Sequence, residues 1–173
     1  MAYGVVRTDK LMATDVRSML ESVKYFVTDS TGEAPVDVET AIENGNVVKV
    51  GGLLAGEREV KKASVPAANT PIDEIVLIAA PEVMYDERKK NLDEYISEAG
   101  KIVRGYHLHS GDIFSVTAEC LANASPAVGQ VVELAASTKW NNVASATASS
   151  TVIGKIIAKD VVGRHTYYVI QVA

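Results

Sequence analysis

The sequence is poor in cysteine, in aromatic residues and in long apolar runs. Its only cysteine, Cys120, excludes an internal disulfide framework and is typical of a protein made in a reducing cytoplasm. Two Phe, seven Tyr and one Trp in 173 residues are too few for a platform that stacks nucleic-acid bases. No apolar run approaches the ~20 residues that span a bilayer, and the N-terminal stretch lacks the apolar region of a secretory signal.

The charge pattern excludes further classes of partner. The formal net charge is −5, and the longest basic runs are the pair Lys61-Lys62 and the triplet Arg88-Lys89-Lys90. Domains that bind nucleic acid usually concentrate many more basic residues on one face. We therefore expect neither a nucleic-acid partner nor a membrane partner.

The residues that are present favour β-structure in one globular domain. Hydrophobic residues make up 47% of the chain and charged residues 23%, which is ordinary for a soluble fold of this size. Residues 22–28 alternate polar and apolar side chains, as a half-buried strand does, and 75–80 form a continuous apolar run typical of a strand buried on both faces. Residues 152–158 and 166–172 frame a hairpin. This layout predicts a mainly β barrel or sandwich, a β-rich α+β fold.

One amphipathic helix is predicted over residues 86–99. Apolar side chains recur there with the spacing i, i+3, i+4 and i+7 on one face: Leu92, Tyr95, Ile96 and Ala99. Acidic residues lead the segment, and Gly100 occupies the position that follows a helix end. The charged remainder is interpreted as a solvated face.

Two further expectations concern the N-terminal third of the chain. We expect residues 1–30 to form an N-terminal arm or extension, and residues 31–173 to form a single β-rich domain. Gly51 and Gly52 lie in a strand-like stretch and predict a bulge or a close backbone approach. A phosphate loop is the weaker interpretation, because neither a helix signal nor Gly-Lys-Ser/Thr follows the pair.

The stretch GYHLHSGDIFSVTAEC contains residue types that bind metals. On a strand, His107 and His109 would share a face and hold a metal between them, but a catalytic zinc usually needs a third protein ligand and none is evident. The alternative is a hairpin in which Tyr106 and Leu108 form the apolar face and both imidazoles face water. Asp112 is then a turn residue whose carboxylate accepts backbone N–H groups. We favour the hairpin over a small metalloenzyme that uses His107 and His109.

No catalytic constellation stands out elsewhere. Glu57 and Glu59 fall on one face of a polar strand with basic neighbours, which is typical of an edge strand protected against unwanted pairing. Ser110 has no G-x-S-x-G context. Cys120 lies in a strand-like segment, which favours a buried, inert thiol over a nucleophile. We therefore expect no enzyme, and we assign no catalytic, cofactor-binding or metal-binding residue.

A family resemblance adds a function to this outline. The run LIAAPEVMYDERKKNLDEYISEAGKIVRGYHLHSGDIFSVTAECL, with the later VGQVVEL and IGKIIAKDVVGRHTYYVIQV, resembles small accessory proteins of tailed-bacteriophage heads. These are decoration, or cement, proteins that bind the outside of a capsid. The resemblance covers residues 76–172, and it consists of turn glycines and strand valines, so it transfers no binding residue to a numbered position.

The resemblance implies a structural role. Such proteins are β-rich and non-enzymatic, are made in the infected bacterial cytoplasm, and often form homotrimers at local symmetry axes of the shell. They stabilise the capsid by bridging neighbouring copies of the major capsid protein. The expectation is therefore a capsid decoration protein on the exterior of the virion, with another virion component (a tail or head–tail connector subunit) as the alternative.

Overall fold

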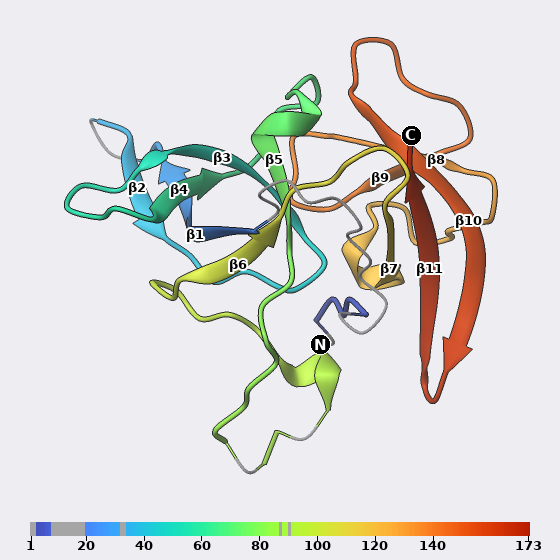
Figure 1. The fold of residues 1–173 in the computed structure, drawn as a ribbon, viewed down its shortest axis with the longest axis horizontal. Helices are drawn as coiled ribbons and strands as arrows, with labels where there is room; N and C mark the ends of the chain where they lie inside the picture. Colours follow the sequence, from blue (N-terminus) through green and yellow to red (C-terminus); the bar gives the residue numbers. More distant parts are fainter. Residues whose placement is uncertain (1–2, 8–19, 32–33, 87, 90) are drawn as a thin grey trace.

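The structure is a computed structural model, and it describes residues 3–7, 20–31, 34–86, 88–89 and 91–173. Within these residues the chain forms strands and three short 3₁₀ turns (Figure 1). The turns are η2 (Ile72–Glu74), η3 (Leu92–Glu94) and η4 (Ala118–Cys120). The strands are β1 (Leu20–Asp29), β2 (Val36–Glu39), β3 (Val47–Leu53), β4 (Val60–Ser64), β5 (Ile75–Ile78), β6 (Val103–Tyr106), β7 (Ile113–Thr117), β8 (Val131–Glu133), β9 (Asn141–Val143), β10 (Val152–Val162) and β11 (His165–Val172).

The first six strands build a closed barrel with one strand added outside it. The ring runs β1-β4-β3-β5-β6 and closes because β1 pairs with both β4 and β6; β2 pairs with the outer part of β1. The β1–β4 pair is parallel and the others are antiparallel. A second, five-stranded antiparallel sheet has the order β7-β11-β10-β8-β9. The predicted mainly β fold is confirmed, and its barrel form is the one observed.

Strand β5 connects the two cores, which explains its unbroken apolar sequence. Val76 and Ile78 face the barrel interior, where they pack in a cluster with Val23 of β1 and Val48 of β3. Ile75 and Leu77 point the other way, into the larger cluster between barrel and second sheet. Because side chains alternate along a strand, a strand buried on both faces needs apolar residues at every position. The strand predicted for 75–80 is confirmed.

The second sheet is fastened to the barrel by hydrogen bonds as well as by apolar packing. Trp140, which is completely buried, donates its indole N–H to the carbonyl of Gly45 at 2.7 Å. The N–H of Val47 donates to the carbonyl of Thr138 at 2.8 Å. These bonds join the start of β3 to the segment before β9, so both sheets belong to one packed unit.

The predicted helix over 86–99 is wrong: the described residues of this range contain no α-helix, only η3. Asn91 and Glu94 form a capping box, as at a helix start, but Tyr95 is already extended (φ −84°, ψ 132°). Ser97 then pairs with Ile42 through two backbone hydrogen bonds of 2.9 and 3.0 Å. A single helix of this length is marginal in water, so tertiary pairing of an extended chain overrides the local pattern.

The boundary expected at residue 30 does not separate an arm from the fold in the described residues. β1 (Leu20–Asp29) closes the barrel, and Val6 forms a bridge to Val116, so the chain around Val6 lies along the β7 edge of the second sheet. Residues 8–19 of the expected arm lie outside the described part of the chain.

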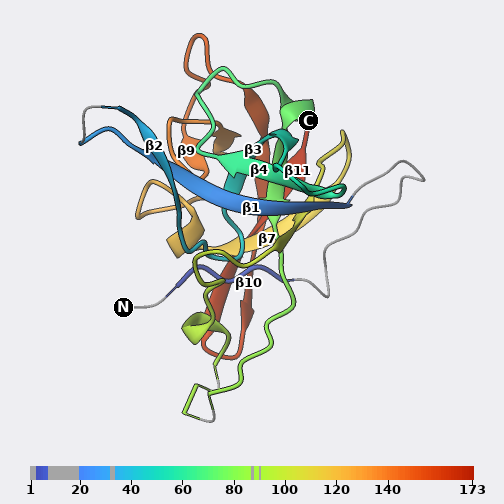
Figure 2. The ribbon, with the colours of Figure 1, turned by 90° about the vertical axis from the view of Figure 1, so that its left-hand side faces the viewer.

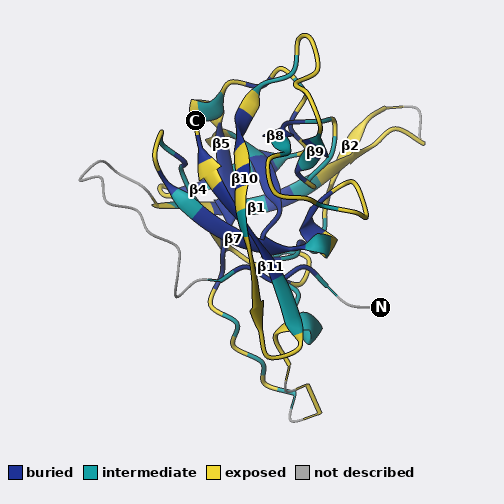
Figure 3. Cartoon of the chain, turned by 90° about the vertical axis from the view of Figure 1, so that its right-hand side faces the viewer, coloured by how far each residue is buried: buried dark blue, intermediate teal, exposed yellow. Residues whose placement is uncertain are grey.

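The predicted glycine bulge and the predicted C-terminal hairpin are both confirmed. The β3–β4 register shifts between Val50 and Leu53, across Gly51 and Gly52. β10 and β11 form a long ribbon that turns at Gly163, whose φ is +59°. The ribbon's buried residues lie within the sheet, and its tip is exposed (Figure 3).

Candidate functional site

The two predicted metal-ligand candidates lie in a connection between strands. β6 ends at Tyr106, so His107 and His109 are not on a regular strand. His107 Nε2 lies 3.3 Å from Oε1 of Glu21, and the same oxygen accepts a 2.6 Å hydrogen bond from Lys61 Nζ. Burial raises the pKa of Glu21, but the hydrogen bonds from Lys61 and His107 outweigh it and hold the pKa below its ordinary value. Glu21 is therefore an anion that links β1, β4 and the end of β6.

His109 takes part in a separate turn. The carboxylate of Asp112 accepts the N–H of His109 at 2.8 Å, and the N–H of Asp112 donates to the carbonyl of His109 at 3.0 Å. This is the turn role predicted for Asp112. The predicted hairpin is wrong, because β6 pairs within the barrel whereas β7 pairs within the second sheet. Leu108 is buried as expected, but the side chains of His107 and His109 are only 19% and 20% exposed and do not face water freely.

The structure does not assemble a metal centre from these groups. His107 and His109 each have a different carboxylate neighbour, Glu21 and Asp112 respectively. Within the part of the chain that is described, no three His, Cys, Asp or Glu side chains come close enough together to hold a metal ion. A third ligand for the histidine pair is therefore not found among the described residues.

Cys120 is a packed core residue. Its thiol is fully buried, and burial raises its pKa to about 12, so the nucleophilic thiolate is scarce at neutral pH. A Cβ built on Gly4 or on Gly45 would lie 2.5 Å from Cys120 Sγ. The sulfur thus fills the space between two backbone segments. The predicted burial of the thiol is confirmed, although Cys120 lies in η4 and not in a strand.

The acidic pair Glu57 and Glu59 lies in an exposed turn before β4, which begins only at Val60. Gly51 and Gly52 lie in β3, and the next element is β4, which pairs with β3. A phosphate loop would need a helix after the glycines, so the phosphate-loop interpretation has no support here.

One buried carboxylate was missed by reasoning from sequence. Glu133 of β8 is completely buried; its Oε1 accepts from Asn141 Nδ2 at 2.9 Å and its Oε2 accepts from the N–H of Thr147 at 2.8 Å. Burial raises the pKa of Glu133, but the hydrogen bonds from Thr147 and Asn141 outweigh it and lower the pKa. Glu133 therefore holds the loop that follows β9, and an acid flanked by Val132 and Leu134 was its only sequence signal.

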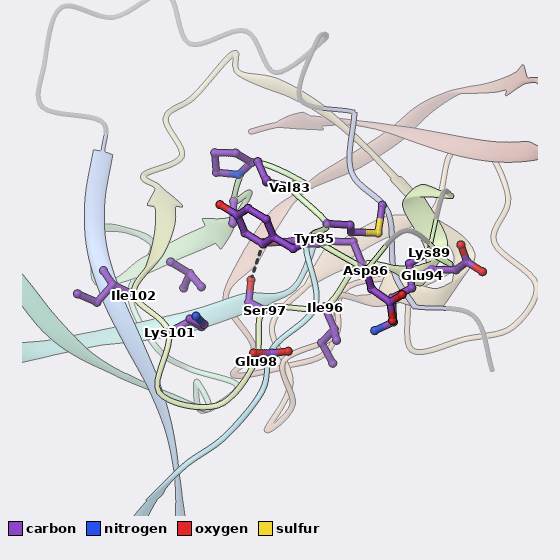
Figure 4. A pocket seen from close by; sticks show the side chains of 15 residues that line it. Val83, Tyr85, Asp86, Lys89, Glu94, Ile96, Ser97, Glu98, Lys101 and Ile102 are labelled. Atoms are coloured by element: carbon purple, nitrogen blue, oxygen red, sulfur yellow. Dashed lines mark hydrogen bonds between the residues drawn. The ribbon is translucent and has the colours of Figure 1, made fainter.

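Within the described part of the chain, the longest connection between two strands is the β5–β6 segment, residues 81–102. Its two limbs enclose a hollow of about 370 Å³ (Figure 4). Apolar side chains such as Ala80, Ile96 and Val103 line it together with charged side chains such as Asp86 and Lys101. Long connections without regular structure in a compact domain are usually functional, so this segment is a candidate contact surface.

The β5–β6 segment and the tip of the β10–β11 ribbon project from the same end of the molecule (Figures 1 and 2). An ion pair between Arg164 and Asp93 joins them. We call the described residues of 81–102 (all but 87 and 90), together with residues 160–166, the projecting end. Tyr85 on the first part is 93% exposed and Val161 on the second is 70% exposed. A monomer gains nothing from exposing such side chains, and aromatic anchors of this kind are typical of protein contacts.

Comparisons of the chain with known protein families, with curated proteins and with solved structures find no match. None of the helical turns in the described residues has the length and apolar character needed to cross a membrane.

Proposed function

We propose that the protein is a non-enzymatic structural protein that decorates a bacteriophage capsid and stabilises it by binding the outside of the major capsid protein lattice. The proposal rests on the resemblance carried by residues 76–172, and the projecting end is the observation that supplies a binding surface for it. The protein acts on the virion exterior as a homo-oligomer, in the simplest case a trimer.

The projecting end has the features that such a surface requires. Val161 is held in the β10–β11 ladder, opposite Thr166. A preformed ladder lowers the ordering cost of binding at Val161, and burial of apolar area at Tyr85 and Val161 supplies the favourable term. Leu92 and Val162 add exposed apolar surface to the same end.

A sedimentation experiment tests this function. Purified protein is mixed at micromolar concentration with undecorated capsids, and the pelleted fraction is measured. We expect co-sedimentation of the wild type and a fall in affinity of at least about tenfold for Tyr85→Ser combined with Val161→Ser, as truncation of interface anchors produces. Leu53→Ser, at an exposed position on β3, is the matched control and leaves binding unchanged. Absence of wild-type binding overturns the proposal.

Location and oligomeric state separate decoration from other roles in the virion. Labelled protein viewed in virions by electron microscopy is expected on the head, and a tail or connector location would favour the alternative virion component. Light scattering of the free protein is expected to give the mass of a trimer, about three times the 18.4 kDa chain.

A further inference from the structure

Residues 3–7 lie along the edge of β7 that faces away from β11 (dark blue in Figure 1). The residues that flank Val6 and Val116 are joined by two backbone hydrogen bonds of 3.0 Å, which run from the N–H of Arg7 to the carbonyl of Ser115 and from the N–H of Thr117 to the carbonyl of Val5. Val6 and Val116 therefore face each other as an antiparallel, non-hydrogen-bonded pair. The segment is bound in one defined register.

We call the residues that receive this segment the slot; they are 43–45, 93 and 115–120. Three further N–H groups of the segment donate to the slot: Tyr3 to the carbonyl of Asp93 (3.1 Å), Gly4 to Oε2 of Glu43 (2.8 Å) and Val5 to Oγ1 of Thr117 (3.3 Å). These partners come from three separate parts of the chain, so the fold as a whole builds the site. Main-chain bonds of this kind supply the affinity when a protein captures an extended peptide as an added strand.

The slot selects the sequence that it holds. A Cβ on Gly4 would lie 2.5 Å from Cys120 Sγ and 3.0 Å from the carbonyl oxygen of Asn44, so a side chain at this position does not fit. The next two side chains, Val5 and Val6, are only 1% and 2% exposed. Gly-Val-Val occurs once in the chain, at residues 4–6. The ligand that matches the slot is therefore this N-terminal segment.

The slot and its ligand are separate pieces of the fold. The eleven strands of the two sheets all lie between Leu20 and Val172, whereas residues 3–7 add one isolated bridge and belong to none of these strands. Departure of the segment therefore breaks no ladder between strands. It would uncover Val116 and Cys120, which are completely buried, so the slot gains by being filled again.

The chain is long enough for the segment to reach another molecule. Twelve residues, 8–19, separate it from β1 in the sequence. Since an extended chain spans at most ~3.6 Å per residue, these residues reach at most roughly 45 Å. A compact chain of this length has a radius of gyration of about 16 Å, so the slot of an adjoining copy lies within that reach.

We propose that the slot is a strand-accepting site for residues 3–7, and that copies of the chain exchange these residues, each filling the slot of a second copy. Every contact made within one chain is then made between two chains, so exchange sacrifices no hydrogen bond and no packing. A chain's own segment competes at an effective concentration on the order of 1 mM, so exchange is populated where copies are held together. The exchange does not rest on the proposed capsid role, because it needs only two copies of the chain.

Disulfide formation between two different full-length variants tests the exchange. Val6→Cys and Val116→Cys proteins are mixed at about 1 mM and oxidised mildly, and covalent heterodimer is measured by mass spectrometry. A non-hydrogen-bonded pair brings the two cysteines to a distance that a disulfide spans. We expect heterodimer to form at least about tenfold faster than with Val5→Cys, the matched control, because residue 5 is equally buried but points away from residue 116. Wild-type protein mixed with Val6→Cys measures any reaction of Cys120.

The same glycine substitution has opposite effects in the two chains. Gly4→Leu in the Val6→Cys chain makes that segment a poor ligand, so heterodimer formation is expected to fall to the Val5→Cys level. Gly4→Leu in the Val116→Cys chain expels that chain's own segment and frees its slot, so heterodimer formation is expected to rise several-fold. Gly4→Ala adds only the clashing Cβ and is expected to act in the same directions.

Trp140 fluorescence checks that each variant is folded. Absence of the Val6→Cys/Val116→Cys heterodimer overturns the exchange, and so does formation at the rate of Val5→Cys. A Gly4 substitution with the same effect in either chain overturns the selectivity of the slot. Capsids are absent from these mixtures, so failure here is distinguishable from failure of the proposed function.

Discussion

Gly105 of β6 packs closely against Val76 of β5 in the barrel interior. A Cβ on Gly105 would lie 2.5 Å from Val76 Cγ2 and 2.9 Å from Val76 Cβ. Valine has one stiff torsion and cannot swing away in a packed core. Glycine is therefore required at position 105 because it has no side chain, and not because of its backbone flexibility.

Gly105→Ala is therefore expected to lower the free energy of unfolding by about 1–3 kcal/mol, as overpacking does. Urea unfolding measures the loss. Gly52→Ala, where a Cβ meets nothing within 4 Å, is the matched control and is expected to stay within about 0.5 kcal/mol of the wild type. Combined with Val76→Ala, the Gly105 substitution should cost less than the sum of the two single changes, and strict additivity would refute the clash.

Glu133 gives a prediction that depends on pH. Glu133→Gln places an amide donor against a hydrogen-bond donor, either Asn141 Nδ2 or the N–H of Thr147, so we expect a loss of about 1–3 kcal/mol at pH 7. The folded pKa of Glu133 lies below its unfolded pKa of about 4.3. Its stabilising contribution is thus complete above about pH 5 and is lost as the pH falls through the folded pKa.

The measurement is urea unfolding of both proteins across that pH range. The difference in stability between wild type and Glu133→Gln should shrink from pH 7 towards the folded pKa. Glu57→Gln, at an exposed turn, is the control and should stay within about 0.5 kcal/mol of the wild type at pH 7. A difference that is constant with pH would mean that the buried carboxylate is not charged in the folded protein.

Among the elements, the β5–β6 segment depends on a few anchors. Tyr95 packs against the barrel core, and its hydroxyl lies 3.3 Å from that of Ser97, which is buried at the Ile42 bridge. Since the described part of this segment has no helix to stabilise it internally, these tertiary contacts determine its conformation.

Tyr95→Ala is expected to cost about 2 kcal/mol, because a half-buried aromatic loses most of its packing, and to speed amide hydrogen exchange at Ser97. Tyr95→Phe keeps the ring and should cost less than about 1 kcal/mol. Exchange measured by mass spectrometry over this segment checks both. Unchanged exchange in Tyr95→Ala would show that the Ile42–Ser97 bridge holds without the ring.

At the scale of the whole molecule, barrel and second sheet share β5 and the hydrogen bond from Trp140 to Gly45. Unfolding should therefore be one cooperative transition. Val76→Ala removes methyl groups from the barrel interior only, yet it should lower the urea midpoint seen by fluorescence of Trp140, the single tryptophan of the chain, by the same amount as the midpoint seen by circular dichroism. A Trp140 transition that does not move would mean that the two sheets unfold independently.

The sequence predicted the strands correctly wherever apolar and polar residues followed a simple periodic pattern. The alternation in 22–28, the unbroken apolar run of 75–80 and the hairpin-forming segments after residue 150 each have one energetically sensible structure, so their strands were predictable. The turn role of Asp112 and the burial of Cys120 also follow from local chemistry. These features of the sequence are enough to determine a mainly β protein.

Only the tertiary structure decided the rest. Residues 86–99 have helical spacing, but the bridge between Ile42 and Ser97 and the packing of Tyr95 favour an extended chain there. Both contacts join residues that are far apart in the sequence. Glu133 is buried because β9 and the loop after it fold over β8. β2 is an edge strand because β4 and β6 pair with the rest of β1. The local preference of a residue for helix or strand amounts to tenths of a kcal/mol. Burial of apolar side chains and pairing of backbone groups together contribute several kcal/mol, and both depend on which distant segments of the chain meet.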